Sequence, residues 1–188
     1  MHNSKKIQNM FETYEEIKHT QKDLDHNQDN AKDPHAKKAF DYAIRILSLR
    51  DYSIYKMKKK LQERKFSEDI IEKTIQKLLD YNYLREEEFT RIRIKQFLVK
   101  GYANSYIKQK LMQEHLNADD QTIDQIRDEQ NLGHNKQLYY LIEKKLRYKE
   151  IPTEFIPKQK LRNKLCSFLA TKGYNYSEIN TALNEFIN

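Results

Sequence analysis

The sequence predicts an all-α fold made of three tandem three-helix repeats in an elongated, curved array. Residues 51–66 (DYSIYKMKKKLQERKF) and 101–116 (GYANSYIKQKLMQEHL) share one pattern at an offset of 50, which indicates a repeated unit. A weaker third copy aligns residues 161–183 with residues 53–75 at an offset of 108. The chain has three glycines, three prolines and no tryptophan, which is typical of helices. Since 38% of the residues are hydrophobic and 34% charged, small units in an array are favoured over one thick core.

Residues 1–37 precede the repeats and form a polar segment of alternating charge. From Gln21 to Asp33 the sequence is almost wholly hydrophilic, and Pro34 follows it. Such a composition cannot bury enough apolar surface to fold by itself. We predict a partly disordered N-terminal extension over residues 1–37.

Each predicted repeat contains three amphipathic helices, because its apolar residues recur at spacings of three and four. The first repeat, residues 38–84, has three apolar stripes: Ala39, Ala43, Ile46 and Leu47; Ile54, Met57 and Leu61; Ile71, Ile75 and Leu78.

The second repeat, residues 85–131, is predicted to form helices from about Glu87 to Val99, from about Asn104 to Glu114, and around Ile123 and Ile126.

The third repeat, residues 132–188, has a loop bracketed by Pro152 and Pro157 between its first two helices. Its apolar positions are the following: Leu138, Leu141, Ile142 and Leu146; Leu161, Leu165, Phe168 and Leu169; Ile179, Ala182, Leu183 and Phe186.

Helix ends support this division. Ser67, Asn117 and Asn175 each follow an aligned apolar residue, and each can accept a hydrogen bond from free amides of the first turn. Acidic residues come next in each copy, where the helix dipole stabilises carboxylates. Gly101 and Gly173, each in a Lys-Gly-Tyr triplet, are predicted to end the preceding helix with a positive φ.

Reactive groupings are missing from the sequence. The six histidines are scattered without helical ligand spacing, so we expect no metal site, and the glycines are too few for a phosphate-binding loop. Cys166 lies between apolar residues of a predicted helix and is interpreted as a buried thiol rather than a nucleophile. The carboxylates at Asp119 and Asp120 are explained by capping. We therefore predict no catalytic residues, no cofactor and no enzymatic activity.

Charge is the remaining signal. The net charge of +7 is distributed as −1 over residues 1–37, +4 over 38–84, −1 over 85–131 and +5 over 132–188. Such a bias favours a polyanion or an acidic protein surface as partner. The alternative is a soluble helical protein whose charged faces are only solvated.

The second helix of the first repeat carries a lysine cluster. A step of about 100° per residue places Lys56, Lys59 and Lys60 opposite the apolar stripe of that helix. Lys58 and Lys65 flank the stripe, where their aliphatic stems can cover apolar surface. We interpret the cluster as a contact surface for phosphates or acidic side chains.

A second basic set in the third repeat is interleaved with Tyr139, Tyr140 and Tyr148. Aromatic rings beside cations suit single-stranded nucleic acid. Half-buried spacers between helices are an equally good interpretation of these tyrosines.

The candidate DNA- or filament-binding residues, chosen by charge geometry alone, are Lys56, Lys58, Lys59, Lys60, Arg64, Lys65, Arg93, Lys95, Lys100, Lys108, Lys144, Lys145, Arg147, Lys149, Lys158, Lys160, Arg162 and Lys164.

Several short stretches match a known family in order and spacing from about residue 37 to 187. They are YAIRILSLRDYS (residues 42–53), the Lys60-Leu61 pair, residues Tyr83, Leu84, Glu86, Glu87 and Phe89, the Lys100-Gly101 pair before Ile107 and Leu111, and FLATKGYNYSEI (residues 168–179). Together they resemble the RecX family of bacterial recombination regulators. The sequence departs from the family pattern at Lys65 and near Asn82, where the family usually has glycine, and at Arg85 and Glu86, where it has two aspartates.

The resemblance implies a non-enzymatic protein of three tandem three-helix units that binds the RecA recombinase filament on single-stranded DNA. Members of the family lodge in the groove of the filament, block its growth, and suppress strand exchange, ATPase and coprotease activities. Direct DNA binding is also implied. The resemblance carries no catalytic residues over to this chain.

Two other functions stay open at this point. One is a helical nucleic-acid-binding protein that acts without a recombinase, and the other is a scaffold that recognises acidic protein partners.

No apolar run approaches the roughly 18 residues of a membrane span, and the N-terminus lacks the apolar core of a secretory signal. We expect a cytoplasmic monomer with no membrane partner.

Overall fold

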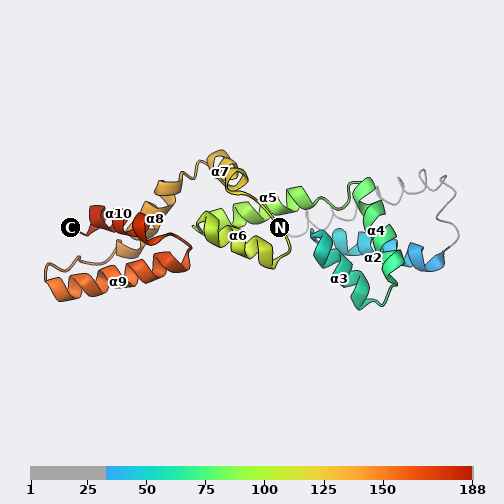
Figure 1. The fold of residues 1–188 in the computed structure, drawn as a ribbon, viewed down its shortest axis with the longest axis horizontal. Coiled ribbons are helices and arrows are strands. Elements are labelled where there is room, and N and C mark those ends of the chain that lie inside the picture. Colours follow the sequence, from blue (N-terminus) through green and yellow to red (C-terminus); the bar gives the residue numbers. More distant parts are fainter. Residues whose placement is uncertain (1–32, 188) are drawn as a thin grey trace, which may run out of the picture. The chain divides into compact units, whose positions relative to one another are not determined.

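The computed structural model describes residues 33–187, which form helices connected by turns and short loops (Figure 1). No strand occurs among these residues, so the predicted all-α repeat fold is confirmed for them. The predicted extension lies outside the described residues up to residue 32, and residues 34–37 belong to the first helix. The described helices are α2 (Pro34–Leu47), α3 (Ile54–Glu63), α4 (Glu68–Asp80), α5 (Glu86–Val99), α6 (Asn104–Gln113), α7 (Asp120–Glu129), α8 (His134–Leu146), α9 (Phe155–Thr171) and α10 (Tyr176–Phe186).

The helices form two compact units. The described residues up to Phe89 make unit 1, which contains α2, α3 and α4, and the residues from Thr90 onward make unit 2, which contains α6 to α10. Helix α5 begins in unit 1 and ends in unit 2.

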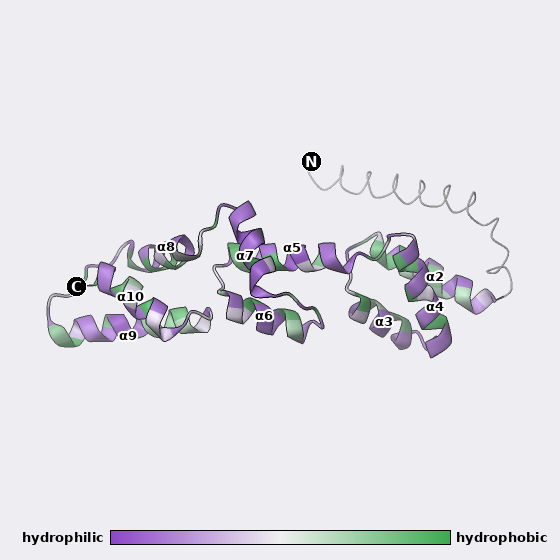
Figure 2. Ribbon diagram, turned by 45° about the horizontal axis from the view of Figure 1, so that its top comes forward, coloured by the Kyte–Doolittle hydropathy of each residue, from purple (hydrophilic) through white to green (hydrophobic). Residues whose placement is uncertain are grey.

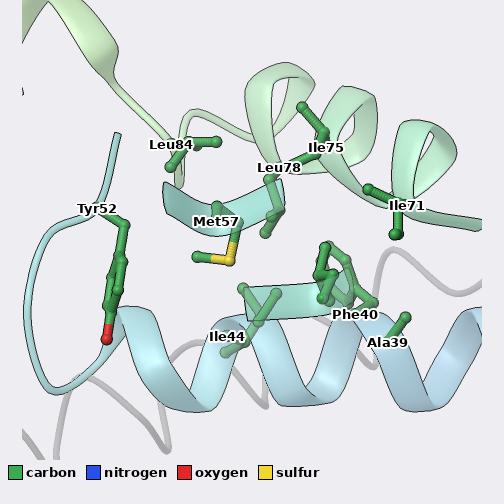
Figure 3. Close-up of a cluster of buried hydrophobic side chains, with 11 residues drawn as sticks. Ala39, Phe40, Ile44, Tyr52, Met57, Ile71, Ile75, Leu78 and Leu84 are labelled. Atoms are coloured by element: carbon green, nitrogen blue, oxygen red, sulfur yellow. The ribbon is translucent and has the colours of Figure 1, made fainter. Parts of the chain in front are cut away.

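Unit 1 is built around an apolar core. Helix α2 packs against both α3 and α4, and α3 packs against α4. Figure 3 shows Met57 of α3 between Ile44 of α2 and Leu78 of α4, and both Met57 and Leu78 are completely buried. The buried core residues of this unit are Ala39, Phe40, Ala43, Ile44, Tyr52, Met57, Leu61, Ile71, Ile75, Leu78 and Leu84.

The second helices of the three helical trios, α3, α6 and α9, present equivalent residues to their cores. Met57, Ile107 and Leu165 are buried at the first aligned position. Leu61, Leu111 and Leu169 have no exposed surface at the second. The internal repeat detected in the sequence is therefore a repeat of buried positions.

Helix C-termini repeat one backbone motif. At the end of α3 the amide of Phe66 donates to the carbonyl of Leu61, and the amide of Lys65 donates to that of Gln62. This pair of bonds is the Schellman motif, which requires a left-handed residue after the C-cap. The same pair of bonds ends α4, α5, α6, α7 and α9.

The left-handed residue of this motif is glycine in only two of the six helices. Gly101 and Gly173 have φ of 72° and 89°, as predicted. The other four positions hold residues with a Cβ, which makes this conformation costly, less so for asparagine. They are Lys65 (61°), Asn82 (57°), His115 (56°) and Asn131 (54°).

Helix N-termini only partly follow the predicted caps. Asn175 caps α10 in a complete capping box with Glu178, which confirms that prediction. Ser67 occupies the N-cap of α4, but its side chain makes no capping hydrogen bond. The prediction for Asn117 is wrong, because α7 begins later and Asp119 accepts from the amide of Thr122. Both Asn117 and Asp119 are capping residue types, so local sequence alone did not distinguish them.

In unit 2, the C-terminus of α9 meets the N-terminus of α6. The amide of Ala103 donates to the carbonyl of Lys172 at 2.9 Å, and the Ser105 hydroxyl donates to the carbonyl of Gly173 at 2.6 Å. A Cβ on Gly173 would lie 2.7 Å from the Cβ of Tyr106. Glycine is therefore required here both by its φ and by the close approach of α6.

The α8, α9 and α10 helices pack together around buried Leu138, Ile142, Leu169, Ile179 and Leu183. Cys166 of α9 is half-buried at the edge of this core rather than fully buried as predicted.

Across the part of the chain that the structure describes, no helix is long and apolar enough to cross a membrane.

A candidate polyanion-binding surface

Helix α3 presents its cations away from the unit 1 core because its N-terminus and apolar face are held. Ser53 caps the helix by accepting from the amide of Lys56 at 3.3 Å, and the carboxylate of Glu86 accepts from the amide of Ile54 at 3.0 Å. Met57 and Leu61 fill the core. Ile54 packs against the edge of this core, and the other positions of the helix, apart from the exposed Tyr55, are polar.

The predicted cations of this region differ in their exposure to solvent and in their bonds to neighbouring side chains. They are Lys56, Lys58, Lys59, Lys60, Arg64 and Lys65. Lys60 donates to Glu63 at 2.6 Å, and this bond raises the pKa of the lysine and lowers that of the glutamate. Lys56 is half-buried, with its ammonium 5.9 Å from the centre of the Phe89 ring, and Lys58 is also half-buried.

Three cations of the α3 region are exposed to solvent, namely Lys59, Arg64 and Lys65. Arg64 is exposed and its guanidinium lies 4.7 Å from the centre of the Tyr42 ring, which orients it without neutralising it. Lys59 and Lys65 are exposed, and no ion pair is recorded for either within residues 33–187. The structure therefore brings the predicted cluster together but leaves Lys59, Arg64 and Lys65 as its accessible charges.

The predicted cations between α5 and α7 are largely engaged within the fold. Arg93 of α5 forms a bidentate ion pair with Glu114, at 3.0 Å for one of its two bonds, and a further bond with Gln96. Lys108 of α6 pairs with Asp120 of α7 at 2.6 Å. Lys95 is half-buried, and Lys108 is exposed but paired, which leaves Lys100 as the exposed member of this set outside these ion pairs.

The acidic pair at the start of α7 has a structural role. The Thr122 side chain and amide hold the pKa of Asp119 below its usual value, and the Lys108 ammonium does the same for Asp120. Both carboxylates therefore stay ionised to lower pH than free aspartate, as expected of a cap and an ion-pair partner.

The predicted cations of α8, α9 and their connection are mostly exposed. Arg162 is half-buried and donates to Asn180 at 3.0 Å and Asn184 at 2.7 Å, which ties α9 to α10. Lys158 is half-buried as well. The exposed members are Lys144, Lys145, Arg147, Lys149, Lys160 and Lys164.

The three tyrosines of this region have different environments. Tyr139 is half-buried, its hydroxyl donates to Glu185 at 2.8 Å, and its ring contacts Phe186. This bond raises the pKa of Tyr139. Tyr140 is 54% exposed and Tyr148 is 91% exposed. Tyr139 is thus a spacer between helices, whereas the other two rings are accessible for stacking.

Sequence reasoning missed a second group of cations and rings in unit 2. Tyr102 and Tyr106 stack with their centres 4.1 Å apart. The Lys172 ammonium lies 4.1 Å from the centre of Tyr102 and donates to the Lys100 carbonyl at 3.0 Å. Lys110 lies 5.3 Å from Tyr106. The two Lys-Gly-Tyr triplets were the available signal, but only their glycines were interpreted.

The structure also buries Arg127, which the sequence analysis left unassigned. This residue of α7 is 1% exposed. Its two terminal nitrogens donate to the side-chain oxygens of Gln137 and Asn104, and its Nε lies 3.5 Å from Asp124. Gln137 in turn donates to the carbonyl of Leu98. This buried network joins α5, α6, α7 and α8.

Tyr174 lies near the same network. It is 4% exposed, and burial raises its pKa to about 12, a rise that the nearby Arg127 charge opposes. The phenol is therefore neutral at physiological pH.

Within the described residues, no group of three or more His, Cys, Asp and Glu side chains could hold a metal ion.

Two family models match the chain. The model of RecX, first three-helix domain, matches residues 39–78, and the model of RecX, third three-helix domain, matches residues 135–183.

Curated relatives carry the same family name. Regulatory protein RecX of Clostridium perfringens (strain SM101 / Type A) is 31% identical over 132 residues, which are 70% of this chain and 60% of that protein. Regulatory protein RecX of Vibrio parahaemolyticus is 28% identical over 142 residues, 76% of this chain and 87% of that protein. A third, from Mannheimia succiniciproducens, is 39% identical over 75 residues, 40% of this chain and 49% of that protein. The chain thus spans about half to 60% of two of these relatives.

Two solved structures share the fold. The crystal structure of RecX from Lactobacillus salivarius has a TM-score of 0.63 at 22% identity and covers 80% of this chain and 96% of that chain. A crystal structure of regulatory protein RecX has a TM-score of 0.62 at 18% identity, over 80% of this chain and 72% of that chain. Because both sequence identities are below 25%, the structural similarity shows a shared fold and nothing more.

Proposed function

The chain belongs to the RecX family of regulatory proteins, and from this premise we propose that it is a non-enzymatic inhibitor of the RecA recombinase. It binds the RecA filament on single-stranded DNA in the cytoplasm as a monomer. Bound there, it lowers the ATPase and strand-exchange activities of the filament during DNA repair and recombination. The observation that carries the proposal is a set of exposed cations in both units of a RecX-like helical protein.

These cations suit a filament that contains DNA. Lys59 and Lys65 are exposed in unit 1, and Lys149, Lys160 and Lys164 are exposed in unit 2. Cations at separate places on the chain can contact phosphates or acidic side chains at separate places on a long partner. Their attraction acts over about 10 Å at 0.1 M salt, so association is expected to weaken as salt rises.

The direct test follows ATP hydrolysis by RecA assembled on single-stranded DNA while purified protein is added. We expect hydrolysis to fall as the protein approaches the concentration of recombinase subunits. Unchanged hydrolysis at stoichiometric protein would reject the proposal.

A charge-reversal variant tests the accessible part of the α3 cluster. We expect Lys59→Glu combined with Lys65→Glu to weaken filament binding roughly 3- to 10-fold at low salt, and less at high salt, since phosphate or carboxylate attraction is replaced by repulsion. Binding is measured by anisotropy of labelled protein on preassembled filaments. Lys56 and Lys60 are avoided because their side chains are partly buried, and Lys60 is also paired with Glu63.

The matched control reverses Lys37 and Lys38, which are exposed on α2 and outside the candidate set. Both double variants change the net charge equally, so long-range steering is the same in each. Equal losses in the two variants would show that the α3 cluster has no local role.

Exposed Tyr140 and Tyr148 beside Lys144 and Lys149 favour a second candidate function, a nucleic-acid-binding protein that acts without RecA. A gel shift on single-stranded DNA, run in parallel with a RecA pull-down, separates the two functions. Tight DNA binding with no RecA association supports the second candidate.

A further inference from the structure

The third helical trio contains an insertion that the other two lack. Helix α9 has 17 residues, whereas α3 and α6 have ten each. At the offset of 108, Ile54 at the start of α3 corresponds to Arg162 inside α9. The first turns of α9, residues 155–161, therefore have no counterpart in α3 or α6, and the loop before them, residues 147–154, is longer than the equivalent loops over residues 48–53 and 100–103. We define residues 147–161 as the α8–α9 insertion.

Most apolar side chains of the α8–α9 insertion lie outside the core. Tyr148 is 91% exposed, Phe155 80%, Ile156 66% and Ile151 41%. None of them belongs to the buried cluster of α8, α9 and α10 or packs against it. Figure 2 shows hydrophobic colouring on the first turn of α9. Single exposed apolar residues are ordinary, but four within nine positions form a local concentration of exposed apolar side chains, a feature that interaction sites share.

Two prolines restrict the insertion. Pro152 lies in the loop and Pro157 lies in the first turn of α9, where a proline fixes φ without removing a helical hydrogen bond. A segment restricted in this way loses less conformational entropy when it binds. The exposed apolar side chains are thus carried on a segment suited to docking.

The charge of this region indicates the surface that it fits. Residues 144–164 contain eight Lys and Arg residues against Glu150 and Glu154. Exposed Arg147, Lys149 and Lys160 lie close in sequence to the exposed apolar residues. A complementary partner has an acidic surface around an apolar pocket.

We propose that the α8–α9 insertion docks on a protein, with Phe155 and Ile156 entering an apolar pocket in an acidic surface of the RecA subunit; this rests on the proposed function. Isoleucine has no flat face for stacking on bases, so the aliphatic part of the patch fits protein better than DNA. The cations of this region would also attract an anionic membrane, but Glu150 and Glu154 directly precede Ile151 and Phe155, so burying these apolar side chains in lipid would desolvate two carboxylates. A protein pocket with a polar rim leaves both carboxylates hydrated.

The test compares Phe155→Ser combined with Ile156→Ser against the wild type. Three affinities are measured for each protein: for RecA filaments held by a non-hydrolysable ATP analogue, for the same single-stranded DNA without RecA, and for vesicles containing anionic phosphatidylglycerol. We expect the variant to lose roughly 10- to 100-fold in filament affinity, as for a buried pair of interface anchors, and to keep its DNA affinity. Helicity should be unchanged because both side chains are exposed.

A matched control replaces Leu49 and Val99, which are 68% and 73% exposed, with serine. This variant also removes two exposed apolar side chains, although smaller ones in total, and should bind filaments like the wild type. If the Phe155 and Ile156 variant also binds like the wild type, the docking proposal is overturned and the proposed function stands.

The other outcomes also overturn the docking proposal. Loss of affinity for DNA without RecA would assign the insertion to nucleic acid. Vesicle binding by the wild type that disappears in the variant would assign it to a membrane. A wild type that fails to bind filaments overturns the proposed function itself, and with it RecA as the docking partner.

Discussion

Unit 1 and unit 2 are both built from three-helix repeats, but the side chains that fill their interiors differ in polarity. In unit 1 the interior is mainly apolar, with Met57, Leu61 and Leu78 completely buried, and its buried polar residues, Ser53 and Thr74, are small and uncharged. In unit 2 a guanidinium is buried as well, since Arg127 is 1% exposed and bonds to Asn104 and Gln137. Arg127 is the one charged side chain among the described residues that is buried to this degree.

The two interiors differ in polarity because they join different numbers of helical trios. Unit 1 contains the single trio α2–α4, whereas the interior of unit 2 joins helices of α5–α7 to helices of α8–α10. An apolar core tolerates many packings, whereas a buried guanidinium needs acceptors at fixed positions, here the side-chain oxygens of Asn104 and Gln137. In unit 2 these acceptors come from α6 and α8, which belong to different helical trios. We infer that Arg127 fixes how α5–α7 and α8–α10 pack within unit 2.

The largest expected effect comes from removing this guanidinium. Arg127→Ala leaves the buried oxygens of Asn104 and Gln137 without their donor and creates a cavity. We expect unit 2 to lose about 3–5 kcal/mol of stability. Hydrogen exchange read by mass spectrometry should show faster exchange in α6 to α10 and unchanged exchange in α2 to α4.

The control for this variant is Arg91→Ala, which removes a more exposed guanidinium paired with Glu129 at 2.7 Å. Its expected cost is under about 1 kcal/mol, as for surface ion pairs. Similar costs for the two substitutions would contradict a special role of the buried network.

A smaller effect is expected where α9 meets α6. Gly173→Ala puts a Cβ 2.7 Å from the Cβ of Tyr106 at a φ of 89°, so α6 must shift and the backbone is strained. We expect unit 2 to lose about 2–3 kcal/mol in urea unfolding followed by circular dichroism.

Gly133→Ala is the matched control, because that glycine has a φ of −52° and a new Cβ would meet only the flexible Lys136 side chain. We expect a loss of no more than about 1 kcal/mol there, because alanine is a poorer N-cap than glycine. If Gly173→Ala is equally mild, the contact between α9 and α6 is looser than described.

The smallest effect has the opposite sign and falls in unit 1. Lys65 occupies the position equivalent to Gly173, with φ of 61°. Lys65→Gly should stabilise unit 1 by about 0.5–1 kcal/mol, because glycine adopts this conformation without a Cβ clash. Thermal unfolding measures the change, and Lys59→Gly inside α3 should instead destabilise by about 1 kcal/mol. A loss of stability in Lys65→Gly would mean that the lysine side chain makes a favourable contact.

Much of the fold could be predicted because its determinants are local. Apolar spacing located the helices, and the aligned copies located the buried positions Met57, Ile107 and Leu165. Family glycines are missing at Lys65 and near Asn82, yet both of these residues adopt the left-handed conformation that glycine favours. The turn is therefore kept without the residue that best suits it. The predicted elongated, curved arrangement of the repeats stays a prediction.

The candidate site could be predicted only in part. Charge patterning found the cations, but not which of them the fold neutralises. Arg93 and Lys108 were predicted as binding residues, and the structure pairs them with Glu114 and Asp120. Arg127 lies four positions after Ile123 on the apolar face of α7, but a charged residue at such a position is usually exposed, so burial was not expected.

The residues alone were sufficient to establish the helices, their repetition and the two C-terminal turns at Gly101 and Gly173, because each depends on side chains within a few positions of one another. Three-dimensional packing was needed to decide which charges stay accessible. Apart from Gln96 and Asp124, which lie three positions away, the partners of Arg91, Arg93 and Arg127 lie between 10 and 38 positions away along the chain. Whether a charge at such a distance is neutralised depends on how the helices meet, and that is set by the packing of their buried faces.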